Sequence, residues 1–329
     1  MANGLPSDYV YDGTGTGTEA DPYVPVTCYQ FMYAIYQENA YVKMTTIIDF
    51  SKDDNYKTGI TSNMEFRCEK LYTDISDSTD LYGINGFNTT SDILFNYNRQ
   101  SAGTTVIDHV CFHNCIWTKS ADFSYWVTAT SNTGFLTKIT NCSYSVLVKQ
   151  NGHYCFLERS DSYNPVRNVS FENCSQYFIF SGSCKYMNSN VNGQTMLQIP
   201  RNECTIEFSN LRYYPEYNGN TYGQTFIGTY SPNDHIKNCT IYGDIHVYTD
   251  EHHSYLTINY GESLYIALRI IHENSDNGYP PQIRTSVSRT LSVIDKDIID
   301  STVSLPSNNY WALLTTSQMK SQQELIAAG

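Results

Sequence analysis

Hydrophobic and polar positions alternate in a short pattern that recurs along the middle of the chain. Its fullest copy places Val169 and Phe171 before Asn173 and Cys174, within "VRNVSFENCS". A period of two puts Val169 and Phe171 on the same face of a strand. The pattern therefore predicts strands that each turn one face toward a core.

Four further copies of this pattern make it an internal repeat. Two are complete or nearly so and two keep only the second half: Val110, Phe112, Asn114 and Cys115; Ile206, Phe208, Asn210 and Leu211; Ile139, Asn141 and Cys142; Ile236, Asn238 and Cys239. Successive asparagines of the five copies are 27, 32, 37 and 28 residues apart. An uneven repeat of about thirty residues is typical of a solenoid.

The asparagine at the end of each copy predicts how the chain turns. Asparagine tolerates left-handed backbone angles better than other non-glycine residues, so it can bend the chain sharply after a strand. The next residue, usually cysteine, then begins a new inward face as a small buried hydrophobe. If coils stack about 4.8 Å apart, the asparagine amides can bond to those above and below. We thus expect a structural ladder of Asn114, Asn141, Asn173, Asn210 and Asn238, and a stacked core of Cys115, Cys142, Cys174, Leu211 and Cys239.

These features predict an all-β protein, a right-handed parallel β-helix. The repeated Val-x-Phe-x-Asn-Cys unit resembles the coil of right-handed, single-stranded β-helix proteins of pectate-lyase-like architecture. Residues 15–51, "GTGTEADPYVPVTCYQFMYAIYQENAYVKMTTIIDFS", resemble the entry segment of β-helix proteins found among bacteriophage minor structural and tail proteins. The final "LTTSQMKSQQELIAAG" resembles a C-terminal helix of such proteins. The resemblance implies a virion protein.

The predicted organisation has three parts. Residues 1–26 form an extended N-terminal arm, laid against a neighbour. Residues 27–250 hold a capping helix, over about 27–40, and the parallel β-helix. Thr27 is the expected N-cap with Gln30 three residues later, and the helix covers apolar side chains and strand edges that the first coil would leave bare. Residues 251–329 supply further strands and a terminal docking helix, which Thr315 and Gln318 open in the same way.

Charge and composition limit the kinds of partner that we expect the protein to bind. The net charge of −13 disfavours binding to nucleic acid, whose phosphates an acidic surface repels. We find neither a secretory signal nor an apolar stretch long enough to span a bilayer, so we expect assembly in a host cytoplasm and a final location in the virion. The 29 tyrosines either decorate strand faces or contact other subunits and host-surface glycan. Aromatic residues are enriched and charged residues depleted at protein interfaces. Because the chain has many tyrosines and few charged residues, we expect a homotrimer that also contacts other virion proteins.

The cysteines and histidines raise the question of disulfides and metals. A cytoplasmic protein keeps its thiols reduced, although stacked coils leave a bridge between neighbouring rungs open. His109, Cys111, His113 and Cys115 alternate in "HVCFHNC". On a straight strand they would span about 20 Å, whereas zinc needs all its ligands within about 2.3 Å of one ion. We expect no metal or other cofactor.

Catalytic patterns are sparse. No acidic residue recurs at a fixed position of the repeat, and the carboxylates in or near it are scattered: Asp108, Asp234, Asp244 and Asp250. A glycosidase needs two carboxylates at a defined separation. We therefore expect a non-enzymatic virion structural protein, a fibre-like or spike-like component of tail or head. The alternative is a phage-borne polysaccharide depolymerase, a hydrolase or lyase, on the same scaffold.

Overall fold

The computed structural model is mostly β-strand, and its strands pair in parallel. It describes residues 2–76, 79–91, 93–97, 103–118, 124–129, 135–148, 152–157, 169–180, 183–186, 195–197, 201–202, 205–215, 225–227, 236–237, 239–249, 255–258, 261–262, 265–274, 282–285, 292–306 and 311–327. The chain divides into two compact units, Met1–Phe178 and Ile179–Gly329. The predicted divisions after residues 26 and 250 stay predictions.

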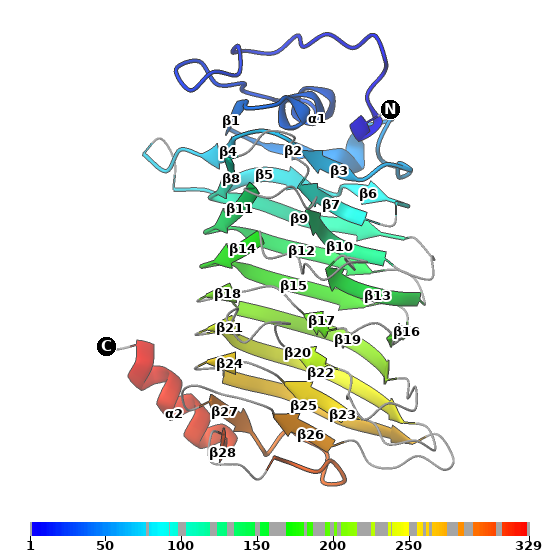
Figure 1. Cartoon of the computed structure of the whole chain (residues 1–329), viewed down its shortest axis with the longest axis vertical. Coiled ribbons are helices and arrows are strands. Elements are labelled where there is room, and N and C mark those ends of the chain that lie inside the picture. The colour runs from blue at the N-terminus through cyan, green and yellow to red at the C-terminus, as the bar shows by residue number, and fades with distance from the viewer. Residues whose placement is uncertain are drawn as a thin grey trace. The chain divides into compact units, whose positions relative to one another are not determined.

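Unit 1 contains three rows of parallel strands (Figure 1). The first row is β1 (Tyr41–Met44), β4 (Lys70–Thr73), β8 (Gly103–Asp108), β11 (Phe135–Thr140) and β14 (Val169–Glu172). The second is β2 (Ile47–Asp49), β5 (Tyr82–Asn85), β9 (Val110–Trp117), β12 (Ser143–Val148) and β15 (Ser175–Phe180), with the short β6 (Asn88–Thr89) also paired to β9. The third is β3 (Met64–Phe66), β7 (Ile93–Tyr97), β10 (Ser124–Ala129) and β13 (Gly152–Leu157). Each row thus joins segments about one repeat apart.

Unit 2 contains strands of the same kind. One row is β18 (Arg201–Asn202), β21 (Ile236–Lys237) and β24 (Gly261–Glu262). Another is β16 (Ser183–Tyr186), β19 (Thr205–Pro215), β22 (Thr240–Thr249), β25 (Tyr265–Asn274), β27 (Ser292–Asp295) and β28 (Trp311–Leu314). The last is β17 (Thr195–Leu197), β20 (Thr225–Ile227), β23 (Tyr255–Ile258) and β26 (Gln282–Thr285). Parallel pairing therefore continues after the asparagine repeat fades.

The predicted inward positions of the repeat lie in the core where the structure describes them. Val110, Phe112 and Ile206 are fully buried and Phe171 is nearly so. Aromatic rings fill the core of unit 1; Phe112 stacks on Tyr144, with ring centroids 4.8 Å apart and planes inclined by 6°. The side chains of Val169 and Phe208 lie outside the described residues.

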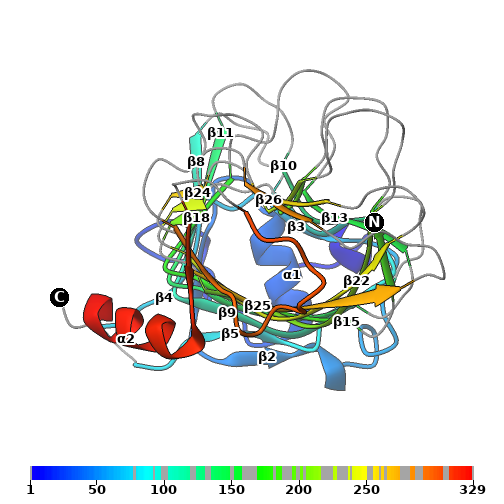
Figure 2. The same cartoon turned by 90° about the horizontal axis from the view of Figure 1, so that it is seen from below.

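Helix α1 (Cys28–Tyr36) contacts β2 and β3 and lies at one end of the rows of unit 1 (Figure 1); Figure 2 shows it in the view along the rows. Thr27 caps it as predicted, because its Oγ1 accepts a hydrogen bond from the Gln30 N–H. The Gln30 side chain bonds to the N–H of Val26 rather than to that of Thr27. The helix ends at Tyr36, earlier than predicted, and Asn39 takes a left-handed φ of 60° before β1 begins.

Within the described residues, the other helices are α2 (Thr316–Ala327) and two short 3-10 turns, η1 (Ala2–Gly4) and η2 (Phe50–Lys52). The capping box of α2 is reciprocal: Thr315 Oγ1 accepts from the Gln318 N–H, and Gln318 Oε1 accepts from the Thr315 N–H. Met319 is buried, and α2 contacts β27 and β28 within unit 2.

The N-terminal arm folds onto its own chain, whereas the sequence led us to expect it against a neighbour. Tyr23 pairs in parallel with Val42 of β1. The Asn3 side chain donates to the carbonyls of Met32 and Glu65, at 3.0 Å each. The arm therefore satisfies backbone groups that the first strands would otherwise leave open.

Candidate functional site

The corners between the first and second rows of unit 1 carry a polar column. Asn141 joins β11 to β12 with φ 54°, and Asn173 joins β14 to β15 with φ 51°. Register pairs Thr140 with both Asp108 and Glu172, so the residue after Asp108 occupies the same position one rung earlier. That residue is His109, with φ 53°. We call His109, Asn141 and Asn173, each with left-handed backbone angles, the corner column.

Asn114 is not part of this column, and here the predicted ladder must be corrected. Asn114 lies inside β9, where Phe112 pairs with Tyr144 and Cys115 with Val146. Two β9 residues thus face one β12 residue, which is a β-bulge. The left-handed φ of 50° at Asn114 belongs to the bulge. The four residues apolar-x-Asn-Cys occur at both places. At Asn114, however, the chain kinks within a strand, whereas at Asn141 it turns between two strands.

Asn114 instead continues a second polar ladder, on β2, β5 and β9. Its Nδ2 donates to Asn85 Oδ1 at 2.7 Å, and Asn85 Nδ2 donates to Asp49 Oδ1 at 3.0 Å. Asp49 and Asn85 are register partners. Side-chain amides therefore link successive strands here, but Asn114 is joined to Asn85 and Asp49, which lie outside the repeat, and not to another asparagine of the predicted ladder.

The two remaining asparagines of the predicted ladder fall in unit 2. Asn210 lies inside β19, where Phe208 pairs with Gly243 and Leu211 with Ile245. This shift in register matches the one at Asn114, so Asn210 occupies a bulge as well. The side chains of Asn210 and Leu211, and the whole of Asn238, lie outside the described residues.

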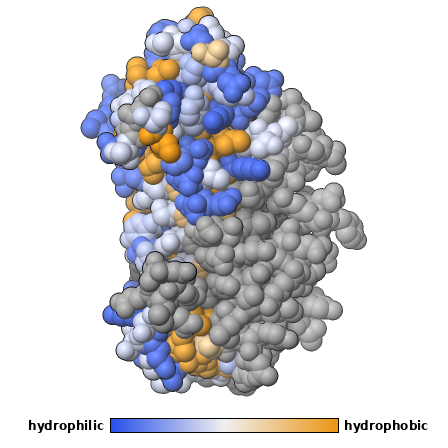
Figure 3. All heavy atoms as spheres, turned by 90° about the vertical axis from the view of Figure 1, so that its left-hand side faces the viewer, coloured by the Kyte–Doolittle hydropathy of each residue, from blue (hydrophilic) through white to orange (hydrophobic). Residues whose placement is uncertain are grey.

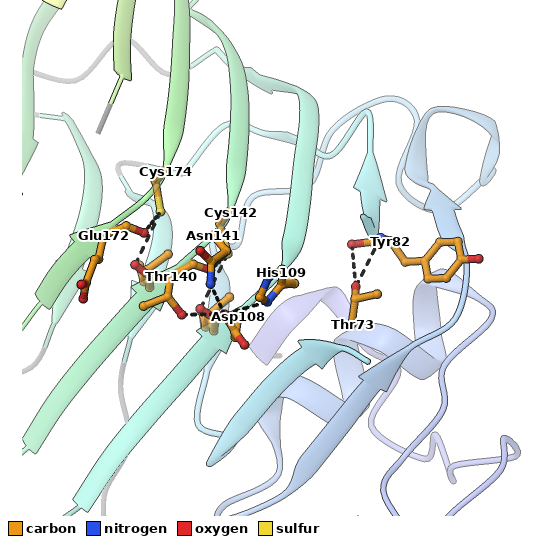
Figure 4. Close-up of polar contacts among 11 residues, drawn as sticks. Thr73, Tyr82, Asp108, His109, Thr140, Asn141, Cys142, Glu172 and Cys174 are labelled. Atoms are coloured by element: carbon orange, nitrogen blue, oxygen red, sulfur yellow. Dashed lines mark hydrogen bonds and ion pairs between the residues drawn. The ribbon is translucent and has the colours of Figure 1, made fainter. Parts of the chain in front are cut away.

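The corner column holds a network centred on Asp108 (Figure 4). Asp108 Oδ1 accepts from Thr140 Oγ1 at 2.6 Å and from Asn141 Nδ2 at 2.9 Å. His109 Nδ1 lies 3.0 Å from the same oxygen, without the alignment of a hydrogen bond. Burial raises the pKa of Asp108, but the bonds from Thr140 and Asn141 and the nearby imidazole outweigh burial and lower it overall. Asn141 therefore bonds to a carboxylate one rung away rather than to another asparagine.

The cysteines after the corner asparagines are buried thiols. Cys142 and Cys174 are each 2% exposed. Both donate to carbonyls of their own corner and of the preceding rung: Cys142 to Thr140 and Ile107, at 3.1 and 3.6 Å, and Cys174 to Glu172 and Ile139, at 3.2 and 3.5 Å. Cys115 and Cys239 are fully buried. Seven cysteines whose side chains the structure describes are free thiols, namely Cys28, Cys68, Cys111, Cys115, Cys142, Cys174 and Cys239.

The histidines and cysteines of "HVCFHNC" do not gather around one point. Cys111 and Cys115 are buried, whereas Nε2 of the half-buried His113 contacts Ser143 Oγ on β12. Burial lowers the pKa of His113, which favours the neutral imidazole. Among the residues that the structure describes, no three His, Cys, Asp or Glu side chains are grouped to hold a metal ion.

The chemistry available at the corner is limited by where its hydrogen bonds go. The Thr140 hydroxyl donates to Asp108, so the imidazole of His109 does not activate it as a nucleophile. Among the other carboxylates considered, Asp244 forms a two-pronged ion pair with Arg269, with Nε at 2.9 Å from Oδ1. Asp234 and Asp250 lie outside the described residues. The corner is a network that holds adjacent rungs together.

Comparison with protein-family models, with curated proteins and with solved structures found no match. No helix within the described residues is long and apolar enough to cross a membrane. Hydrophilic and hydrophobic side chains are interspersed on the described part of the face in Figure 3.

Proposed function

We propose that the chain is a right-handed parallel β-helix that serves as a non-enzymatic structural component of a bacteriophage virion. The observation that carries the proposal is the pairing of segments about thirty residues apart in parallel rows, with apolar strand faces buried where the structure describes their side chains. Such stacking suits a stiff, elongated element, because each rung is bonded along its length to the next. The virion assignment rests on the resemblance of residues 15–51 and of the terminal segment to phage proteins.

We infer further that the protein is a homotrimer that binds other virion proteins and presents tyrosines to host-surface glycan. A tail or head fibre needs a rigid body and contact surfaces, which aromatic side chains supply at small entropic cost. Tyrosine is the commonest aromatic residue of the chain, at 29 of 46.

The virion assignment is tested on particles of the phage whose genome encodes the chain. Antibody fragments raised against the recombinant protein should label the tail or head of purified particles in electron micrographs. Mass spectrometry of the same gradient-purified particles should detect the protein at stable stoichiometry. Particles of an unrelated phage, prepared alongside, serve as the control. Absence of the protein from particles, with its presence in the infected-cell lysate, would overturn the assignment.

A further inference from the structure

We propose that residues 3–24 are an exchangeable segment, and that the strand edges they cover bind the same segment of a second copy of this chain. The proposal concerns contacts within unit 1 and does not depend on the virion assignment. It would reconcile an arm that folds onto its own chain with a sequence that suggested a neighbour.

The arm covers the edge of β1 as an added strand would. The N–H of Tyr23 donates to the carbonyl of Tyr41 at 2.9 Å, and the N–H of Lys43 donates to the carbonyl of Tyr23 at 2.8 Å. The N–H of Tyr41 donates to the carbonyl of Gly17 at 2.9 Å. Main-chain bonds of this kind form with any extended segment that reaches the edge, whether from the same chain or another.

Asn3 provides a second anchor, at the edge of β3. Its Oδ1 accepts from the Glu65 N–H at 2.7 Å while its Nδ2 donates to the Glu65 carbonyl at 3.0 Å. The side-chain amide thus pairs with β3 as a peptide group of a neighbouring strand would. Asn3 is fully buried and its φ is 56°, so the site accepts a particular residue in a particular conformation.

The side chains of the arm make the site selective for this arm. Tyr11 stacks on Tyr33 of α1 with ring centroids 5.5 Å apart, and Tyr9 contacts Tyr29 at 5.5 Å. Tyr9 and Tyr11 thus meet α1 at a fixed spacing, which an occupant needs and a second copy supplies.

The contacts also permit exchange. Asn3 and Leu5 are buried, but the rings of Tyr9, Tyr11 and Tyr23 are only partly buried, and the link to α1 passes through Val26, which is 58% exposed. The arm can therefore detach while α1 keeps its own buried contacts. Swapping between copies replaces each lost contact with an identical one, so its net cost is small.

The test mixes two full-length preparations. One is unlabelled and carries the photo-crosslinker p-benzoylphenylalanine in place of Tyr11, beside Tyr33; the other is the unaltered chain labelled with ¹⁵N. After incubation and illumination, mass spectrometry identifies whether the crosslinked α1 peptide is unlabelled or ¹⁵N-labelled. We expect mixed-isotope crosslinks that increase with incubation time and are suppressed by an excess of a synthetic peptide of residues 2–26. Crosslinks within single chains only, at all times and concentrations, would overturn the proposal.

Two variants of the ¹⁵N-labelled chain test the anchor. Asn3→Ala should raise the rate of exchange about tenfold, because the bonds to Glu65 and Met32 hold the arm in place. Ser7→Ala, at an exposed arm position, should leave the rate unchanged. Circular dichroism shows whether each variant is folded. Equal rates for the two folded variants would contradict the role of Asn3, and the unaltered chain decides the exchange itself if Asn3→Ala does not fold.

Discussion

At the scale of single residues, the corner column shows why one residue type recurs and another can replace it. The position needs a left-handed backbone, and Asn141 and Asn173 supply it. His109 fills the same position because histidine, like asparagine, is enriched among non-glycine residues with positive φ. The sequence contained a signal for this substitution, since "DHVC", "TNCS" and "ENCS" align at the three corners. The aromatic-x-Asn pattern in "FHNC" directed the alignment to Asn114 instead.

Replacing Asn141 with Ala should destabilise the protein by about 2 kcal/mol. Alanine loses the bond to the Asp108 carboxylate. It also lacks the short polar side chain through which asparagine tolerates the left-handed region, which adds about 1 kcal/mol. Asn141→Gly removes the bond but tolerates the backbone, so it should cost less than Asn141→Ala. Urea unfolding measures both changes. An Asn141→Ala variant as stable as the unaltered chain would show that the corner does not depend on this side chain.

His113 should make stability depend on pH. Burial lowers its pKa in the folded state, so between that value and the unfolded value of about 6.5 the unfolded chain binds more protons. Stability is therefore full above about pH 6.5 and declines as the pH falls through this window. His113→Gln keeps a polar group near Ser143 without the titration, and its urea midpoint should fall less between pH 7 and pH 5. A loss equal in both chains would exclude His113 as the cause.

At the scale of elements, close approach between neighbouring strands explains residues that the repeat does not. Gly83 of β5 pairs with Cys111 of β9, and a Cβ on Gly83 would lie 1.9 Å from the Cys111 carbonyl oxygen. The strands can sit at this distance only because glycine has no side chain. The helix caps, in contrast, are local, and the sequence predicted Thr27 and Thr315 correctly.

Gly83→Ala should therefore cost about 1–3 kcal/mol, because backbone must move to accept the methyl group. Thr45→Ala, an exposed position between β1 and β2, should stay within about 0.5 kcal/mol of the unaltered chain and serves as the control. Thermal or urea unfolding compares the two. Equal stability of both variants would mean that β5 shifts away from β9 without cost.

At the scale of the whole molecule, buried thiols and polar ladders have the same role: they bond each rung to the next. The seven cysteines whose side chains the structure describes are buried free thiols, and the two ladders join side-chain amides and carboxylates across strands.

The proposed trimer predicts one dominant particle of three 37.5-kDa chains in mass photometry. Aromatic side chains, which are enriched at interfaces, would be buried between subunits while charged residues are largely excluded. Dilution over two orders of magnitude should leave this particle intact. A single-chain mass at all concentrations would contradict the trimer.

The sequence by itself determined what depends on neighbours in the chain. Period-two alternation identified the inward face at Val110, Phe112, Phe171 and Ile206, and side-chain chemistry identified the caps of both helices and the left-handed asparagines. Tertiary structure alone decided which residues stack. Asn114 and Asn141 have the same local pattern and nearly the same φ, yet one lies at a bulge and the other at a corner. Register is set by hydrogen bonds between segments about thirty residues apart, and a four-residue pattern carries no information about them.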